Sequence, residues 1–191
     1  METTIEIRMA AQADAKEILE IYKPYITHTA ITFEYTVPTV EEFAERIGFI
    51  LTKYPYIVAT KGKHIIGYAY ASAFKNRQAY DWAVETSIYV SQEHHGKGIG
   101  KKLYLSLEDI LTQQNVLNLN ACIAFISTDD PHLTNASMYF HQHLGYRKAA
   151  HFFKCGYKFG AWYDMIWMEK LIGKHISNPE PFIPITELYI T

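Results

Sequence analysis

Cysteine is scarce in this chain of 191 residues, which contains Cys122 and Cys155 and no other. Two cysteines this far apart form neither the dense disulfide framework of a small secreted domain nor a paired-cysteine metal motif. Proteins of reducing compartments rarely depend on disulfides. The sequence therefore predicts a protein of the cytoplasm.

A surplus of positive charge and long hydrophobic runs are absent as well. Eighteen Lys and Arg residues stand against twenty Asp and Glu residues, which gives a formal net charge of −2. Nucleic-acid binders show a basic stripe that this balance does not indicate. No uninterrupted apolar run approaches the ~18 residues of a membrane-spanning helix, and residues 1–16 lack the apolar stretch of a secretory signal. We therefore expect neither a nucleic acid nor a membrane as partner.

Apolar residues are plentiful and follow both helical and strand patterns. They make up 49% of the chain, enough to form the core of one domain. The helical spacing predicts helices over residues 13–27, 40–51, 99–113 and 134–143. Runs rich in β-branched and aromatic residues predict strands over 6–10, 56–60, 64–74, 82–90 and 117–126, and a final pair around 152–153 and 162–168. This order predicts an α/β fold with a central mixed sheet and helices on both faces.

The chain divides into one domain over residues 1–172 and a tail over residues 173–191. Three prolines in the tail exclude regular structure there. Apolar residues such as Phe182 and Ile183 make the tail unlike a free linker. We expect it to pack on the domain or on a dimer partner.

A glycine-rich loop between a predicted strand and a predicted helix is the most specific feature of the sequence. Gly96, Gly98 and Gly100 alternate at the start of the helix, close to Lys97 and Lys101. Glycines leave open the unpaired N–H groups of a helix's first turn, which bind anions. The alternative is a flexible turn at a helix start. Three alternating glycines with nearby lysines favour a phosphate site.

Two common phosphate-binding motifs do not fit this loop. A Walker A loop needs a hydroxyl residue where this chain has Lys102. A dinucleotide fingerprint needs a glycine where it has Lys101. The segment from His95 to Gly100 instead resembles the pyrophosphate-binding motif of the GNAT acetyltransferase superfamily, with His in place of the usual first Gln or Arg. The expected order of helices and strands is similar too.

The superfamily resemblance implies how acetyl-CoA is bound as co-substrate. Its pyrophosphate is expected on the loop, at His95, Gly96, Lys97, Gly98, Ile99, Gly100 and Lys101. Its pantetheine arm is expected along the backbone of Ile88, Tyr89 and Val90. A backbone N–H near Val90 is then the expected donor to the oxyanion that forms when the acceptor amine attacks.

A closer resemblance covers nearly the whole chain. The sequences AYDWAVE (79–85), FHQHLGY (140–146) and GYKFGAWYD (156–164), with Thr32-Phe33-Glu34 and the proline-containing tail, look like the phosphinothricin N-acetyltransferase family. This resemblance implies acetyl transfer in a ternary complex from acetyl-CoA to the α-amino group of small amino-acid-like compounds. Phosphinothricin, methionine sulfoximine and methionine sulfone are such acceptors. Members of the family are typically homodimers.

The resemblance also implies two catalytic residues. An amine attacks a thioester only as the neutral base, so a proton must be removed, and Glu85 matches the family's proposed general base, acting directly or through a water. The alternative is that Glu85 orders the ammonium or pairs with Lys75 or Arg77. His141 matches the expected proton donor to the leaving thiolate, and a histidine titrates close to neutral pH. The alternative is a histidine on the helix surface.

The remaining site residues are also carried over from the family. The substrate-binding residues are expected to be Phe33, Glu34, Lys75, Arg77, Tyr80 and Trp82. Cations in this set suit an anionic acceptor group, although Lys75 and Arg77 could also be solvated loop residues. The family's cofactor-binding Asn falls on Thr134, so either Asn135 replaces it or the contact is lost, whereas Ser137 is retained. Lys158 matches the family without an assigned role.

We expect no metal, because the histidine pairs lack accompanying Cys or carboxylate ligands. His141 and His143 point about 200° apart on a helix and cannot share an ion. Two other functions remain open. A non-catalytic acyl-CoA-binding module would not depend on Glu85 or His141, and a peptide N-acetyltransferase would need an open, acidic groove.

Overall fold

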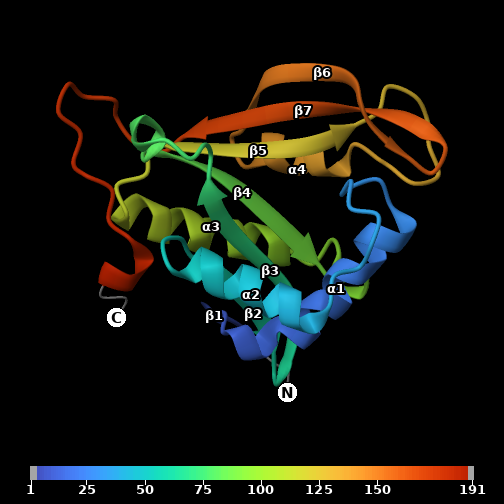
Figure 1. Cartoon of the computed structure of the whole chain (residues 1–191), viewed down its shortest axis with the longest axis horizontal. Helices are drawn as coiled ribbons and strands as arrows, with labels where there is room; N and C mark the ends of the chain where they lie inside the picture. Colours follow the sequence, from blue (N-terminus) through green and yellow to red (C-terminus); the bar gives the residue numbers. More distant parts are fainter. Residues whose placement is uncertain (1–3, 189–191) are drawn as a thin grey trace.

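The computed structural model describes residues 4–188 of the chain (Figure 1). Seven strands form one sheet in the order β1-β2-β3-β4-β5-β7-β6. The strands are β1 (Ile5–Met9), β2 (Tyr56–Lys61), β3 (His64–Ala73), β4 (Ala83–Val90), β5 (Asn118–Phe125), β6 (Arg147–Lys158) and β7 (Ala161–Leu171). The helices are α1 (Ala15–His28), α2 (Val40–Leu51), α3 (Ile99–Gln113) and α4 (Ala136–His143), with short 3-10 turns between elements. The predicted mixed sheet is confirmed.

Helices cover both faces of the sheet, as predicted. The alternation of side chains along β2 shows why, because the strand is buried on both sides. Ile57 and Ala59 belong to a core shared with α3. Tyr56 and Val58 belong to a second core shared with α1 and α2. Stacked tyrosines from β2, β3 and β4 fill much of this second core, so many of the abundant tyrosines are structural.

Capping residues and glycines mark the ends of three helices. Thr39 caps α2: its hydroxyl accepts from the Glu42 N–H, and the Glu42 carboxylate accepts from the Thr39 N–H. Gly98, with a φ of 75°, precedes α3. Gly145, with a φ of 91°, follows the end of α4, where the left-handed conformation favours glycine.

The pairing of β4 with β5 is parallel and short. It joins Ala83–Glu85 to Asn118–Asn120, and beyond that point the two strands diverge (Figure 1). All other neighbouring strands described in the sheet are antiparallel. The divergence creates an opening between two halves of the sheet, β1–β4 on one side and β5–β7 on the other.

The tail returns from β7 to the ends of α2 and α3. The Gln114 side-chain amide donates to the carbonyls of Ile183 and Lys53, and Trp82 Nε1 donates to the carbonyl of Glu180. Phe182 packs against the Tyr54 ring at 5.4 Å between centroids. In residues 4–188 no helix is long and apolar enough to cross a membrane.

Candidate active site

The free edge of β4 is the first component of the site. Ser91 N donates to Ile66 O and Phe74 N donates to Ala83 O, so odd-numbered residues of β4 direct their backbone groups toward β3. Even-numbered residues therefore direct theirs toward β5. Because the described β4–β5 ladder ends at Glu85 and Asn120, the backbones of Ile88 and Val90 face the opening. An extended ligand can pair with this edge.

The glycine loop at the end of β4 is the second component. Gly96 and Gly98 have φ values of 72° and 75°, in the left-handed region that favours glycine. A Cβ at either position would meet no described atom within 4 Å, so the space above the N-terminus of α3 is open. Together with the unpaired N–H groups of this helix, that space fits a phosphate group.

Gly100 lies at a point of close packing. A Cβ there would lie 3.2 Å from the Phe140 ring and 3.5 Å from Ile88. The missing side chain therefore allows α3 to approach α4 and β4 closely. Ile99 is buried in the core.

His95 holds the loop against the end of β4. Its Nε2 lies 3.0 Å from the Val90 carbonyl oxygen and 2.8 Å from the Tyr25 hydroxyl, which also donates to that carbonyl. Lys97 Nζ donates to the Glu93 carbonyl within the same loop. His95 and Lys97 thus order the loop by contacts within the protein, while Lys101 is exposed.

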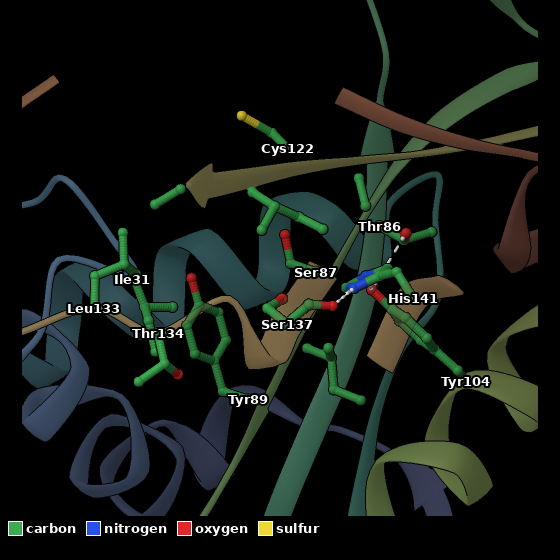
Figure 2. Close-up of a pocket in the computed structure, with 14 residues that line it drawn as sticks. Ile31, Thr86, Ser87, Tyr89, Tyr104, Cys122, Leu133, Thr134, Ser137 and His141 are labelled. Atoms are coloured by element: carbon green, nitrogen blue, oxygen red, sulfur yellow. Dashed lines mark hydrogen bonds between the residues drawn. The ribbon is translucent and has the colours of Figure 1, made fainter. Parts of the chain in front are cut away.

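A pocket lies where β4 and β5 diverge, lined by side chains of β4, β5, α3 and α4 (Figure 2). His141 lies in the wall of this pocket and is 3% exposed, so it is not a histidine on the helix surface. Its Nδ1 lies 2.7 Å from the Ser137 carbonyl oxygen and its Nε2 lies 2.9 Å from the Tyr104 hydroxyl. A carbonyl can only accept, so Nδ1 carries the proton and Nε2 accepts from Tyr104.

Burial lowers the pKa of His141 to about 4, and the hydrogen bond to Ser137 opposes this only in part. The expectation that His141 titrates near neutral pH is therefore wrong. The imidazole is neutral at pH 7 and its one proton is engaged by the Ser137 carbonyl. Buried hydroxyls extend the network, since Tyr104 and Tyr146 both lie within hydrogen-bond distance of Thr86 Oγ1.

Glu85 lies on the face of β4 that is opposite the α3 side. Burial raises the pKa of its carboxyl, and the positive charge of Lys75 opposes the rise. No ion pair within 4.0 Å joins Glu85 to a cation in the described part of the chain. The carboxylate is thus a stronger base than usual and is available to a ligand.

The expected substrate-binding residues fall into three groups. Lys75, Tyr80 and Trp82 line one groove with Asn120, Phe152 and Trp167. Phe33 lies over Gly156, and Glu34 forms a 2.7 Å ion pair with Arg46. Arg77 is not in the groove and lines a separate hollow with Lys53 and Asp81. Lys75 also lines this hollow, so Lys75 and Arg77 lie along the same cavity although only Lys75 reaches the groove.

Asn135 uses its side chain to hold β5. Its Nδ2 donates to the Ile126 carbonyl at 2.7 Å and its Oδ1 accepts from the Ile126 N–H at 3.2 Å. Thr134 and Ser137 line the pocket instead. Among residues 4–188 no group of three or more His, Cys, Asp or Glu side chains could hold a metal.

Three residues of the site are not predicted by the sequence. Tyr104 belongs to the apolar stripe of α3, Tyr25 to that of α1, and Arg46 to the exposed side of α2. Helical periodicity marks the first two as core residues. The contacts that distinguish them depend on the packing of distant elements, which no local signal carries.

Comparisons with known proteins agree with this geometry. A family model described as an acetyltransferase (GNAT) domain matches residues 7–167. A phosphinothricin N-acetyltransferase of Streptomyces viridochromogenes is 31% identical over 96% of both chains. An L-methionine sulfoximine/L-methionine sulfone acetyltransferase of Salmonella typhimurium is 31% identical over 90% of this chain and 96% of its own.

A solved structure is similar over almost the whole length. The GNAT superfamily phosphinothricin acetyltransferase from Sinorhizobium meliloti, crystallised in complex with acetyl-CoA, is 36% identical and gives a TM-score of 0.84. The match covers 96% of this chain and 98% of the other. The fold, the extent of the family match and the identity to these relatives agree, and the chain belongs to the GNAT family of N-acetyltransferases.

Proposed function

We propose that this protein transfers the acetyl group of acetyl-CoA to the α-amino group of small amino-acid-like acceptors, of the phosphinothricin, methionine sulfoximine and methionine sulfone type. The observation that carries the proposal is the placement of Glu85 on β4. One end of this strand leads into an open phosphate cradle, and beyond Glu85 its backbone edge is not paired with β5 in the described structure. The same strand thus presents a base and the surface for an acyl donor.

The residues of the cradle fit acetyl-CoA. Gly96 and Gly98 leave space for the pyrophosphate, and the N-terminus of α3 supplies N–H groups and a positive dipole end. The edge at Ile88 and Val90 supplies backbone groups to the pantetheine arm, and a Val90 N–H is suited to stabilise an oxyanion. When bound, acetyl-CoA supplies the activated acetyl group.

Glu85 is the proposed general base. The α-amino group of an amino acid is mostly an ammonium at neutral pH and must lose a proton before it attacks. The raised pKa of Glu85 brings its basicity closer to that task. Whether it acts directly or through a water, the carboxylate is partly buried and is not engaged by a protein cation within 4.0 Å.

Lys75 supports a zwitterionic acceptor. Its charge acts on Glu85, yet its Nζ lies more than 4.0 Å from the Glu85 carboxylate oxygens. Its Nζ lies over the rings of Phe74 and Trp167, 5.2 and 5.9 Å from their centroids. A carboxylate near Lys75 and an amine near Glu85 complement these charges. An acidic groove for lysine-rich peptides is not supported here.

A homodimer is part of the proposal. Exposed aromatic side chains gather on the β6–β7 hairpin: Phe153 is 74% exposed, Trp162 58%, and Tyr157 and Phe152 48% each. β6 is also an edge strand. A concentration of exposed aromatic residues is typical of a protein interface. We also propose that the protein acts in the cytoplasm.

Two-substrate kinetics test the function. Thiol release from acetyl-CoA is measured while acetyl-CoA and methionine sulfone are both varied. Attack in a ternary complex predicts intersecting double-reciprocal lines. Parallel lines would indicate an acetylated enzyme and contradict direct attack. An absence of thiol release with all three acceptors, despite saturable acetyl-CoA binding, would indicate a non-catalytic acyl-CoA-binding module.

A further inference from the structure

Lys158, at the end of β6, is a buried lysine to which the mechanism above gives no role. It is 3% exposed. Its Nζ donates to the carbonyl of Thr29 at 2.9 Å and to that of Thr32 at 2.8 Å. No carboxylate lies within 4.0 Å of it in the described residues, although Glu34 attracts it at longer range. A buried ammonium is costly unless hydrogen bonds satisfy it, so these two carbonyls are essential partners.

The carbonyls belong to the segment after α1, which we call the acceptor loop (residues 29–35). Phe33 and Glu34 of this loop are expected substrate residues. The loop lies against the end of β6 at two further points. The Phe33 ring occupies the space above Gly156, where a Cβ would collide with it. The Tyr35 hydroxyl donates to the Tyr157 carbonyl.

These contacts join the two halves of the sheet at the open end of the site. The acceptor loop follows α1, which packs on β3 and β4, whereas Lys158 ends a strand of the β5–β7 half. Figure 1 shows the segment after α1 rising toward the β6–β7 hairpin. The Ala30 N–H adds a bond to the carbonyl of His132, which precedes α4. Beyond the point where β4 and β5 separate, contacts of β6 with the acceptor loop thus connect the two halves of the sheet.

We propose that Lys158 is a positioning residue that fixes the acceptor loop against β6 and so sets the shape of the acceptor site. Its ammonium holds the two carbonyls that flank residues 30 and 31, and Phe33 and Glu34 follow directly. This inference rests on the proposed function, because the loop matters for catalysis only if a small acceptor binds beside it. The glycine loop and the edge of β4 lie on other elements and do not depend on Lys158.

The test compares Lys158→Met with wild type. Methionine keeps the length of the apolar stem but cannot donate to the carbonyls. We expect kcat/KM for methionine sulfone to fall by about 10–100-fold through a higher acceptor KM, as displaced positioning groups cause. The Kd of acetyl-CoA should stay within about twofold of wild type. Lys148→Met, at an exposed position of the same strand, is the matched control.

Hydrogen–deuterium exchange provides a readout that does not need turnover. Lys158→Met should increase exchange in residues 29–38 and leave α3 unchanged. Gly156→Ala disturbs the Phe33 contact without removing the charge, and it serves if Lys158→Met fails to fold. An unchanged acceptor KM together with unchanged exchange in residues 29–38, in whichever variant folds, would overturn the proposal. If wild type acetylates no small amine, the proposed function fails, and the exchange result still decides whether Lys158 positions the loop.

Discussion

Glu85, the proposed general base, takes its chemical properties from its surroundings. Its carboxyl is partly buried, its pKa is raised by that burial, and no described cation neutralises it within 4.0 Å. Glu85→Gln keeps shape and hydrogen bonding but removes basicity. We expect kcat/KM to fall by about 10²–10⁴, the usual contribution of a general base, while the Kd of acetyl-CoA stays the same.

The pH dependence follows from the direction of the shift. A general base acts when deprotonated, so wild-type kcat/KM should rise with pH as Glu85 ionises. Because the pKa of Glu85 is raised, this rise should occur at a higher pH than is usual for a glutamate. This rise of kcat/KM with pH should vanish in Glu85→Gln. The decrease of kcat/KM caused by the substitution should also become smaller at high pH, where free neutral amine is present. A loss of equal size at every pH would mean that Glu85 only holds the ammonium.

His141 leads to a second prediction at this scale. Its pKa of about 4 implies a neutral imidazole with the proton on Nδ1 from pH 5 to 8. Nitrogen-15 NMR of the ring nitrogens should show this tautomer and no titration in that range. Because the unfolded residue binds a proton below its usual pKa of 6.5, folding stability should fall as pH drops from there toward 4. A titration midpoint near 6.5 in the folded protein would contradict this prediction.

The sequence resemblance pointed to Ile88, Tyr89, Ser137 and His141 in the pocket at the opening, but it could not supply their environments. The charge of Lys75 acts on Glu85, but the alternative that the two form an ion pair is not seen within 4.0 Å in the described residues. Arg77 does not line the groove with Tyr80 and Trp82; it lines the hollow beside Lys53, which Lys75 also borders. Trp82 binds the tail as well as lining the groove. Such outcomes depend on contacts between elements that are distant in the chain.

At the scale of elements, two glycines at the start of α3 have different surroundings. Gly98 borders the open cradle, whereas Gly100 packs against Phe140. Gly98→Val forces a branched side chain into a left-handed conformation, at a strain of about 1–3 kcal/mol, and fills the open cradle. The Kd of acetyl-CoA should rise by about tenfold or more, corresponding to about 1.4 kcal/mol. Gly160→Val carries the same strain at φ 77° with no described atom within 4 Å, away from the glycine loop, and should leave that Kd unchanged.

Gly100→Val tests the packing role of Gly100. The new side chain meets the Phe140 ring, and overpacking of this kind costs about 1–3 kcal/mol. We expect the main effect to be a lower Tm in thermal unfolding. If calorimetry found acetyl-CoA binding by Gly98→Val unchanged, the loop would not be the phosphate site.

Elements with strong local signals were predicted best. Helix 99–113 has the predicted bounds, because its apolar stripe is regular and a glycine precedes it. β6 was predicted only around residues 152–153 and in fact covers Arg147–Lys158. This edge strand shows no regular alternation of buried and exposed residues, and its register with β7 shifts between Phe152 and Gly156. A period-2 pattern could not reveal it.

At the scale of the whole molecule, the exposed aromatic hairpin predicts self-association. Trp162→Glu places a charge in the proposed interface, so light scattering should detect a monomer where wild type is a dimer. Phe49→Glu is the matched control, because Phe49 is 79% exposed on α2 and lies on another part of the surface. A monomeric wild type at micromolar concentration would refute the homodimer.

Competition between acceptors decides which class of amine this protein acetylates. Wild-type protein is incubated with acetyl-CoA and an equimolar mixture of methionine sulfone, methionine sulfoximine, phosphinothricin and a lysine-rich peptide with a free N-terminus, and the products are identified by mass spectrometry. We expect one acetyl group on the α-amino nitrogen of the small acceptors and an unmodified peptide. Acetylation of the peptide, with the three small acceptors unmodified, would contradict it.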